Sequence, residues 1–410
     1  MSARRKLVVA TSFPIHPPRG GGQARVAGLY GALAATGVEV DIVALTNGSE
    51  RARTLHPAPG LREFRVPMTP LHVGAVAQLQ QRTGVPAGDL GLALHHDLTP
   101  AYGDALAVAA KDASAVVACH PFVSKALTAS SDLPLVYESQ DVEGDLKAAM
   151  YAASAHADAL IDTVRGIEGE CCARAHHVTV CADADGRRLD ELYGLGATPV
   201  ITVPNGADPA AVTYTDLDER RARRESVGLG AEQLAVFVGS WHEPNLVVVR
   251  DLLRQAVALE GVRVLLLGSA GLAFADEPLP GNFDVCGVVD DAFLASVLSI
   301  AHVALNPMTV GSGSNLKMLE YALAGVPIVS TRFGARGLDL EPGRHYVEAD
   351  VDALPATLAA LRAEPAATTA ARVRAIREHV DAHFTWRSIA AAWQAHPAFQ
   401  DLFDHSVVSA

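Results

Sequence analysis

The sequence has few cysteines and no long apolar run, and these absences exclude several classes of protein. Its five cysteines form no CxxC pair, which argues against structural zinc, and their odd number favours free thiols in a reducing compartment. The longest apolar stretch, residues 264–275, is interrupted by two glycines and is shorter than the roughly 18–20 residues that span a bilayer. The apolar run at residues 7–10 is too short for the core of a signal peptide. We therefore expect a cytoplasmic protein without a transmembrane segment.

Several motifs of common enzymes are also absent. The glycines of residues 17–25 lack the GxGxxG spacing of dinucleotide-binding dehydrogenases, and no P-loop or GxSxG motif occurs. Asp183 and Asp185 form a DxD, but they follow an expected strand at a helix start, where acids complement the helix dipole. His379 and His383 lack the glutamate that an HExxH zinc motif places between its histidines. These patterns disfavour dehydrogenases, ATPases, serine hydrolases and metalloproteases.

Acidic residues outnumber basic ones, with 46 Asp and Glu against 33 Lys and Arg, so the formal net charge is −13. A chain with this balance repels nucleic acid, and we expect no nucleic-acid partner. A short basic segment at the N-terminus leaves peripheral contact with an anionic membrane open. The 410 residues, half of them hydrophobic, are enough for two or three domains.

Short apolar runs rich in β-branched residues alternate with segments of helical period. This rhythm predicts an α/β fold with two open parallel sheets covered by helices on both faces. The expected strands are residues 7–11, 38–45, 115–119, 135–138, 177–181, 200–203, 234–238, 263–267, 283–286, 302–305 and 327–330. Two prolines and an Asn-Gly pair in residues 203–209 mark a linker between the sheets. Residues 46–100 show no clear periodicity and are expected to lie over one edge of the first domain, with no strand assigned.

Residues 311–322 are the strongest candidate for binding a ligand. They follow an expected strand, and their small residues let a ligand approach the backbone amides at the positive end of a helix that begins near Ser314. Lys317 is the only lysine after Lys147 and would supply a point charge for a diphosphate, while Glu320 could accept hydrogen bonds from ribose hydroxyls. The residues expected to bind the nucleotide ligand here are Ser312, Gly313, Ser314, Asn315, Leu316, Lys317 and Glu320. The alternative is a capped helix with an exposed lysine and glutamate.

Two further glycine turns are weaker candidates. One contains Gly239 and Ser240 and leads to Asn245, whose amide near a helix start could face an anion. The other, in residues 17–25, is expected to be a flexible loop whose residues Gly21, Gly22 and Arg25 contact a substrate, a product or a phosphate. The alternative for the first turn is ordinary punctuation of an α/β fold, and the alternative for the second is a mobile loop without a ligand.

Polar residues also follow two neighbouring strands of the first half. His120 ends one strand, and Gln140, Asp141 and Glu143 follow the next. The carboxyl ends of parallel strands meet at one edge of a sheet, so these residues are expected to share a crevice and to serve as the catalytic group with Lys317. The alternative for each is to cap or charge-balance the helix that follows.

Together these segments resemble the GT-B-fold retaining glycosyltransferases of the family-4 type over nearly the whole chain. The resemblance is carried by residues 13–33, 137–143, 203–206 and 237–240, and most specifically by residues 313–331. It implies two Rossmann-like domains facing across a cleft. The acceptor-binding domain would span residues 1–204, completed by a C-terminal helix at about 384–410, and the donor-binding domain would span residues 205–383.

The resemblance also implies the chemistry: a hexosyl group moves from a nucleoside diphosphate sugar to an acceptor hydroxyl with retention, without a metal or other cofactor. Glu320 matches the family acid that binds the ribose, and Val288 lies in a loop that resembles the one meeting the nucleobase. Ser312 and Gln140 replace an acid and a histidine of the family, and Lys317 stands in for a cation missing from residues 239–245. The acceptor stays open between a small molecule, a lipid-linked sugar and a polysaccharide, as does the oligomeric state.

Two other functions remain open at this stage. A nucleotide-sugar 2-epimerase would use acids and histidines in the same kind of site on a single substrate. A non-catalytic nucleotide-sugar-binding partner protein would account for Ser312 and Gln140.

Overall fold

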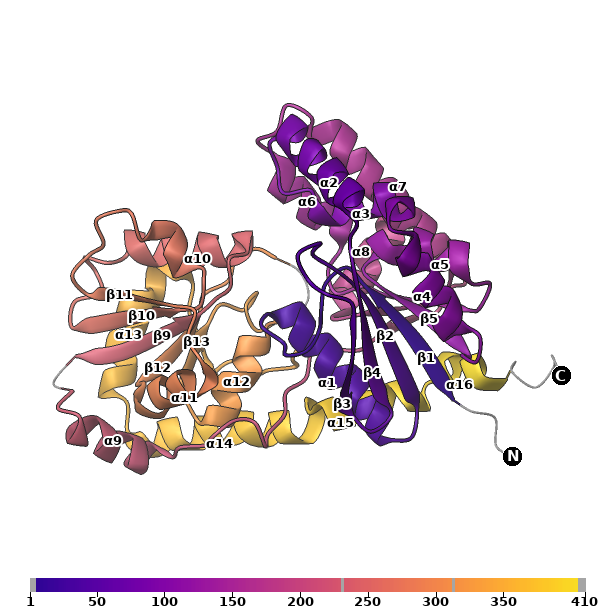
Figure 1. The fold of residues 1–410 in the computed structure, drawn as a ribbon. Helices are drawn as coiled ribbons and strands as arrows, with labels where there is room; N and C mark the ends of the chain where they lie inside the picture. The colour runs from indigo at the N-terminus through magenta and orange to yellow at the C-terminus, as the bar shows by residue number, and fades with distance from the viewer. Residues whose placement is uncertain (1–4, 230–231, 312–313, 405–410) are drawn as a thin grey trace. The chain divides into compact units, whose positions relative to one another are not determined.

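The computed structural model describes residues 5–229, 232–311 and 314–404, and the chain divides into two compact units (Figure 1). Unit 1 contains the described residues up to Pro204 together with those from Trp386 onward, and unit 2 runs from Asn205 to Thr385. Each unit has its own mainly parallel β-sheet with helices on both faces. This confirms the expected α/β class with two Rossmann-like parallel sheets.

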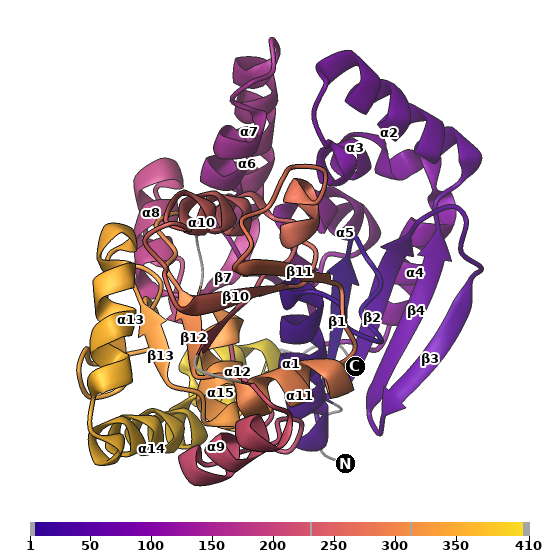
Figure 2. The same ribbon diagram turned by 90° about the vertical axis from the view of Figure 1, so that its left-hand side faces the viewer.

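The sheet of unit 1 has the strand order β3-β4-β2-β1-β5-β6-β7-β8. Neighbouring strands are parallel except β3 and β4, and β3 forms an outer edge (Figure 2). The strands are β1 Lys6–Thr11, β2 Glu39–Thr46, β3 Arg53–Ala58, β4 Leu61–Pro67, β5 Ala115–Cys119, β6 Leu135–Glu138, β7 Ala175–Val180 and β8 Val200–Thr202. The helices are α1 Gly21–Ala35, α2 Pro70–Thr83, α3 Gly88–His95, η1 His96–Leu98, α4 Pro100–Ala110, η2 Pro121–Val123, α5 Ser124–Ser130, α6 Glu143–Tyr151, α7 Ala157–Arg174, α8 Asp183–Tyr193, α15 Trp386–Ala395 and α16 Pro397–Asp404.

Strand β1 shows why this sheet is buried on both faces. Its residues alternate between two hydrophobic clusters, as side chains of a strand alternate between faces. Leu7 and Val9 pack with side chains of α1, α15 and α16, whereas Val8 and Ala10 pack with side chains of α4 and α5. The continuous apolar run in the sequence follows from this two-sided burial.

Residues 46–100 contain two strands that the sequence analysis did not assign. Strand β4 carries Arg62, Glu63 and Arg65, so apolar and polar residues do not alternate along it as they do in a typical half-buried strand. These charges are paired inside the fold, because buried Glu63 accepts hydrogen bonds from Arg65 and from the backbone of the loop after β1, at Ile15 and His16. Tertiary pairing of charges therefore concealed the strand.

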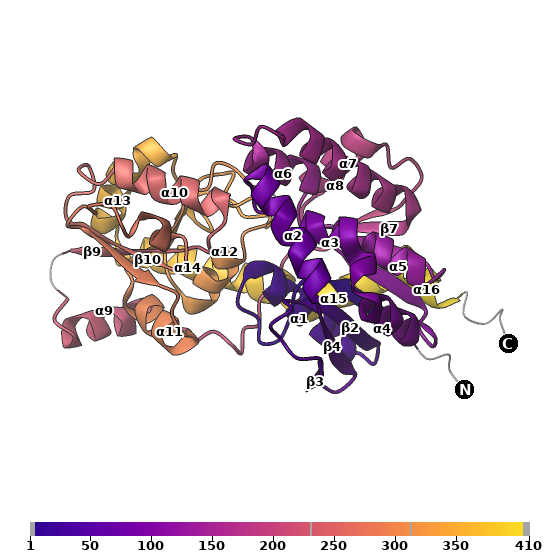
Figure 3. The ribbon, with the colours of Figure 1, turned by 45° about the horizontal axis from the view of Figure 1, so that its top comes forward.

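Unit 2 has the strand order β11-β10-β9-β12-β13-β14, with every neighbouring pair parallel. Helices α10 and α13 cover one face of its sheet, and α11, α12 and α14 cover the other (Figure 3). The strands are β9 Gln233–Val238, β10 Val262–Leu267, β11 Phe283–Gly287, β12 Val303–Asn306, β13 Ile328–Ser330 and β14 Val347–Glu348. The helices are α9 Leu217–Ser226, α10 Glu243–Arg254, η3 Gly271–Phe274, α11 Asp291–Ile300, α12 Leu316–Ala324, η4 Val351–Ala353, α13 Leu354–Ala363 and α14 Ala366–His383.

Each expected strand occurs, with its ends moved by at most two residues, and β3, β4 and β14 are additional. In both sheets the first strand lies in the interior, so the strand order reverses between β1 and β5 in unit 1 and between β9 and β12 in unit 2. Open α/β sheets bind ligands at the carboxyl ends of the strands beside such a reversal. Topology thus marks one candidate location in each unit.

No helix in the described ranges combines the length and the apolar character needed to cross a membrane.

A buried histidine predicts how unit 1 responds to acid. His177 lies on β7 with no exposed surface, and burial, together with the nearby His176 and His396, lowers its pKa to about 3 from the usual 6.5. Below pH 6.5 the unfolded chain binds a proton that the folded chain does not, so unit 1 loses stability as the pH falls. Between about pH 6.5 and 5 we expect a loss of about 2 kcal/mol.

The measurement is hydrogen–deuterium exchange of α15, whose Trp393 indole Nε1 donates to His177 Nε2 at 3.4 Å. A His177→Gln variant keeps an acceptor for the indole and cannot be protonated in this range. Its exchange, corrected for intrinsic rates, should therefore depend less on pH than that of the parent protein. Equal pH dependence in both proteins would contradict the assignment.

Candidate functional site

The candidate donor site of unit 2 lies where β9 and β12 end. The turn after β9 contains Gly239 and Ser240 and leads into α10. A Cβ atom on Gly239 would lie 2.8 Å from the Phe237 ring and 3.2 Å from Asn245, so a side chain there would push the turn away from α10. Asn245 Nδ2 donates to the Ser240 carbonyl at 3.1 Å, which fixes the direction of its amide.

Lys317 connects this turn to the second predicted segment. Its Nζ donates to Asn245 Oδ1 at 2.8 Å and lies 4.2 Å from the centroid of the Phe237 ring. Burial lowers the pKa of Lys317 to about 7. The positive charge of Arg336 also lowers this pKa, whereas the negative charge of Glu320 raises it. An anion placed beside Nζ would favour the charged ammonium again. The two sequence segments therefore meet at a cation that lacks a full counter-charge.

The first turn of α12 adds backbone donors. The helix begins at Leu316, two residues later than the sequence suggested, and the amides of Leu316 and Lys317 have no acceptor within the helix. Glu320 lies on the same helix, three residues beyond Lys317. Burial raises the pKa of Glu320, the Lys317 charge opposes this shift, and Asp291 adds to it. The carboxylate has no hydrogen-bond partner among the described residues, so it could accept from a ligand hydroxyl.

Two predicted ligand contacts instead hold the loop before α12. Ser314 accepts hydrogen bonds from Asn205, whose backbone N donates to Oγ at 3.3 Å and whose Nδ2 donates to the carbonyl at 2.9 Å. Asn315 Nδ2 donates to the Gly334 carbonyl at 2.7 Å. These bonds tie the loop to distant parts of unit 2 and fix where α12 starts.

The remaining predictions for unit 2 have mixed outcomes. The backbone N–H of Asn245 does not face an anion, because it donates to the His242 carbonyl at 2.9 Å. Val288 follows β11, and its side chain is 76% exposed. Ser312 and Gly313 lie outside the described residues.

In unit 1 the loops after β1, β5 and β6 come together at the switch point. His120 follows β5 with a φ of 80°, a backbone angle that costs a non-glycine residue energy and is typical of functional positions. Its Nδ1 lies 3.1 Å from Glu143 Oε1, and its ring stands edge-on to Phe13 with centroids 5.4 Å apart. Burial lowers the pKa of His120, but the bond to Glu143 and the charges of Glu143, Asp89 and Asp141 outweigh it and raise the pKa overall.

Gln140 lies in the same cluster. Its Nε2 donates to the sulfur of Cys119 at 3.2 Å, and its Oε1 would be 2.7 Å from a Cβ atom on Gly22. The missing side chain at Gly22 therefore makes room for Gln140. Gly21 and Gly22 form the first turn of α1, which corrects the expected flexible loop.

The prediction that Arg25 contacts a phosphate is also wrong, because its guanidinium is buried inside unit 1. Its side chain is 1% exposed; its Nε donates to Glu138 Oε1 at 2.9 Å, and its Nη1 donates to the Pro204 carbonyl at 3.1 Å. Tyr30 donates to the other oxygen of Glu138. A carboxylate with no exposed surface needs such partners, so Arg25 serves the core.

Sequence analysis missed two charged residues beside His120. Lys147 Nζ donates to Asp89 Oδ2 at 2.8 Å and lies 3.8 Å from Glu143 Oε2. The scarcity of lysine in a chain rich in arginine could have indicated Lys147, which also lies one helical turn after Glu143. Asp89 had no such signal, since it is 58 residues away in a region without clear periodicity.

Within the described ranges, no group of three or more His, Cys, Asp or Glu side chains could hold a metal ion.

Comparison with protein families gives two matches along the chain. Residues 19–211 match the family described as Glycosyltransferase Family 4, and residues 245–395 match a family described as Glycosyl transferase-like. Comparison with curated proteins found no match.

Known structures share the fold over the full length of the chain. Sucrose-phosphate synthase from Thermosynechococcus elongatus is 20% identical with a TM-score of 0.77, covering 98% of this chain and 100% of that one. Anabaena HepE in complex with UDP-glucose is 13% identical with a TM-score of 0.65, covering 98% and 99%. The α,α-trehalose 6-phosphate synthase of Burkholderia multivorans is 13% identical with a TM-score of 0.65, covering 98% and 100%.

Two Rossmann-like units, each with polar and glycine-containing loops at its switch point, form the GT-B fold that these structures share. The two family matches lie one in each half of the chain and agree with that fold. The chain belongs to the family-4 type of these glycosyltransferases.

Proposed function

We propose that the protein transfers a hexosyl group from a nucleoside diphosphate sugar to an acceptor hydroxyl, with retention of configuration and without an essential metal. Unit 2 binds the donor, and unit 1 binds the acceptor. The observation that carries the proposal is Lys317, whose Nζ lies beside Asn245 and above Phe237 at the strand ends where α/β sheets bind ligands. The complex of HepE with UDP-glucose supports a donor of this chemical class.

The residues of unit 2 act on the leaving group. As the glycosidic bond breaks, negative charge grows on the diphosphate, and Lys317 with the amides at the start of α12 stabilises it. Glu320 accepts from the ribose hydroxyls. The departing phosphate oxygen can itself take the proton of the acceptor hydroxyl, so the protein mainly positions its substrates and excludes water.

The test is a turnover assay with UDP-, GDP- and ADP-glucose and a panel of sugars, sugar phosphates and lipid-linked acceptors. We expect release of the nucleoside diphosphate that depends on an acceptor, a product whose anomeric proton keeps the donor's configuration, and no loss of rate in a chelator. An epimer formed from the donor alone would favour the epimerase. Donor binding without turnover on any acceptor would favour a non-catalytic partner protein.

Donor affinity should depend on pH. The ammonium of free Lys317 has a pKa lowered to about 7 by burial, and the bound diphosphate favours the charged form. Affinity should therefore fall about tenfold between roughly pH 6 and pH 8, because a growing share of the free protein must take up a proton on binding.

Calorimetry with an intact nucleotide sugar tests this, since its diphosphate diester does not titrate in that range. Proton uptake on binding should be visible as a heat that varies with the ionisation enthalpy of the buffer. A constant affinity with no proton uptake would place Lys317 away from the diphosphate.

A further inference from the structure

A row of four charged side chains crosses unit 1 beside the switch point. Asp89 on α3 pairs with Lys147 on α6, Lys147 lies near Glu143 at the start of the same helix, and Glu143 meets His120 after β5. Along the row the exposed fraction of the side chain falls from 43% at Asp89 to 7% at Lys147 and 4% at Glu143, and it is 15% at His120. Glu143 and Lys147 lie one helical turn apart, whereas only the fold brings Asp89 and His120 to them.

We propose that Asp89, Lys147 and Glu143 are positioning residues that keep Nδ1 of His120 protonated and leave Nε2–H to donate to a substrate oxygen. This deepens the proposed glycosyl transfer and rests on it. Glu143 accepts from Nδ1, and Nε2 has no hydrogen-bond partner among the described residues. A doubly protonated ring is a donor at both nitrogens.

The balance of charge explains why three residues are needed. Lys147 lies closer to Asp89, at 2.8 Å, than to Glu143, at 3.8 Å, so His120 at 3.1 Å is the nearer partner of the Glu143 carboxylate. The four groups are neutral in sum when His120 is charged, and Asp141 adds a further negative charge nearby. Lys147 also has the buried Tyr151 hydroxyl in its surroundings, but that group stays neutral at ordinary pH because burial raises its pKa.

The start of α6 is held rigidly, so the orientation of Glu143 is set by the fold. Glu168 accepts hydrogen bonds from the amides of Glu143 at 2.9 Å and Gly144 at 2.8 Å. The Tyr137 and Tyr193 hydroxyls donate to the same carboxylate, at 2.8 and 2.6 Å. Glu143 Oε2 has no hydrogen bond in the described part of the chain, and Lys147 at 3.8 Å supplies its nearest counter-charge.

This arrangement makes two opposite predictions. In Asp89→Asn, the Lys147 charge is no longer balanced by Asp89 and acts on Glu143 and His120, so the pKa of His120 should fall by about one unit. In Lys147→Met, both carboxylates lose their cation, so the pKa of His120 should rise by a similar amount. A residue that only supports the fold would not shift the titration in opposite directions.

The experiment is a long-range ¹H–¹⁵N NMR titration of the full chain without substrate, which also reports which ring nitrogen carries the proton. The His120 signals are assigned by their loss in His120→Gln. Asp145→Asn and Lys125→Met are matched controls, because both residues form surface ion pairs, with Arg188 and Glu170. We expect no shift in the controls and opposite shifts in the two test variants.

Kinetics then test the use of this proton. The alkaline limb of kcat should move with the measured pKa in each variant, while KM for the donor changes less than about twofold. Shifts in the pKa of His120 that are absent or of the same sign would overturn the proposal. An alkaline limb of the kcat profile that stays at the same pH in every variant would overturn it too. Opposite shifts in a protein that never transfers sugar would instead count against the glycosyltransferase function alone, since the titration needs no substrate.

Discussion

Replacing Lys317 with methionine should lower the affinity for nucleoside diphosphate sugars by about 10- to 150-fold. This corresponds to the roughly 1.5–3 kcal/mol that a hydrogen bond to a charged group contributes. Methionine keeps the length and the packing against Phe237 but removes the charge beside Asn245. The pH dependence of binding should disappear in the same variant, because the group that titrates is gone.

The stability of the same variant separates a binding residue from a structural one. Burial disfavours the charged form of Lys317, so the empty protein carries an ammonium at some cost. Lys317→Met should therefore be as stable as the parent protein or more stable, while binding is lost. Lys125→Met, at a surface ion pair in unit 1, is the control and should change neither property.

Calorimetry and thermal unfolding of the three proteins provide the test. The parent should gain about 2.7 kcal/mol of stability from a donor at 100 times its dissociation constant, whereas Lys317→Met should gain much less at the same donor concentration. The parent should therefore be the more stable of the two only when donor is present. A Lys317→Met protein that binds every donor as the parent does would remove the central support for the proposed function.

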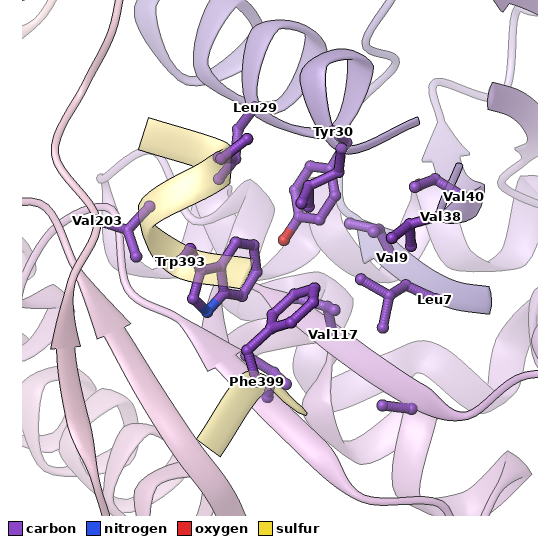
Figure 4. Packing of buried hydrophobic residues seen from close by; sticks show 14 of the residues in the cluster. Leu7, Val9, Leu29, Tyr30, Val38, Val40, Val117, Val203, Trp393 and Phe399 are labelled. Carbon is purple, nitrogen blue, oxygen red and sulfur yellow. The ribbon is translucent and has the colours of Figure 1, made fainter. Parts of the chain in front are cut away.

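Replacing Trp393 with alanine should destabilise unit 1 by about 3–5 kcal/mol, the range for loss of a buried aromatic side chain. Trp393 is 1% exposed and lies on α15, close to Tyr30 and Phe399 (Figure 4). Its ring centroid is 6.2 Å from that of Tyr30 and 5.0 Å from that of Phe399, both in edge-on geometry. Trp393 therefore joins the C-terminal helices directly to the core of unit 1.

The measurement is urea unfolding followed by hydrogen–deuterium exchange, which reports each unit separately. Protection should be lost at lower urea in β1, β5 and α1, with little change in the strands of unit 2. Trp241→Ala is the matched control, since Trp241 belongs to unit 2 and is 59% exposed. Similar effects of the two substitutions would show that α15 contributes little to unit 1.

Local sequence patterns predicted most of the strands, because a strand buried on both faces needs an uninterrupted apolar run. The pattern failed at β4, where Glu63 and Arg65 pair with each other and with the loop after β1. A charged residue reads as exposed in a sequence, and only its distant partner makes it a core residue. The same reasoning accounts for Arg25, whose partner Glu138 is 113 residues away.

The candidate site was predicted in part for a similar reason. Lys317 stood out as a rare lysine after a glycine-containing turn, and that signal is local. Its contact with Asn245, 72 residues earlier, follows from the placement of β9 beside β12. The network beside His120 had almost no local signal, since Asp89 lies in a helix that the pattern did not reveal.

By itself the sequence determined the α/β class, the two sheets and the resemblance to family-4 glycosyltransferases, since these depend on periodicity and on short motifs. Tertiary structure alone decided which charges are buried in the core and which are left for a ligand. The physical reason is that the free energy of a charge depends on its neighbours and its burial, and both are set by strand order rather than by adjacent residues.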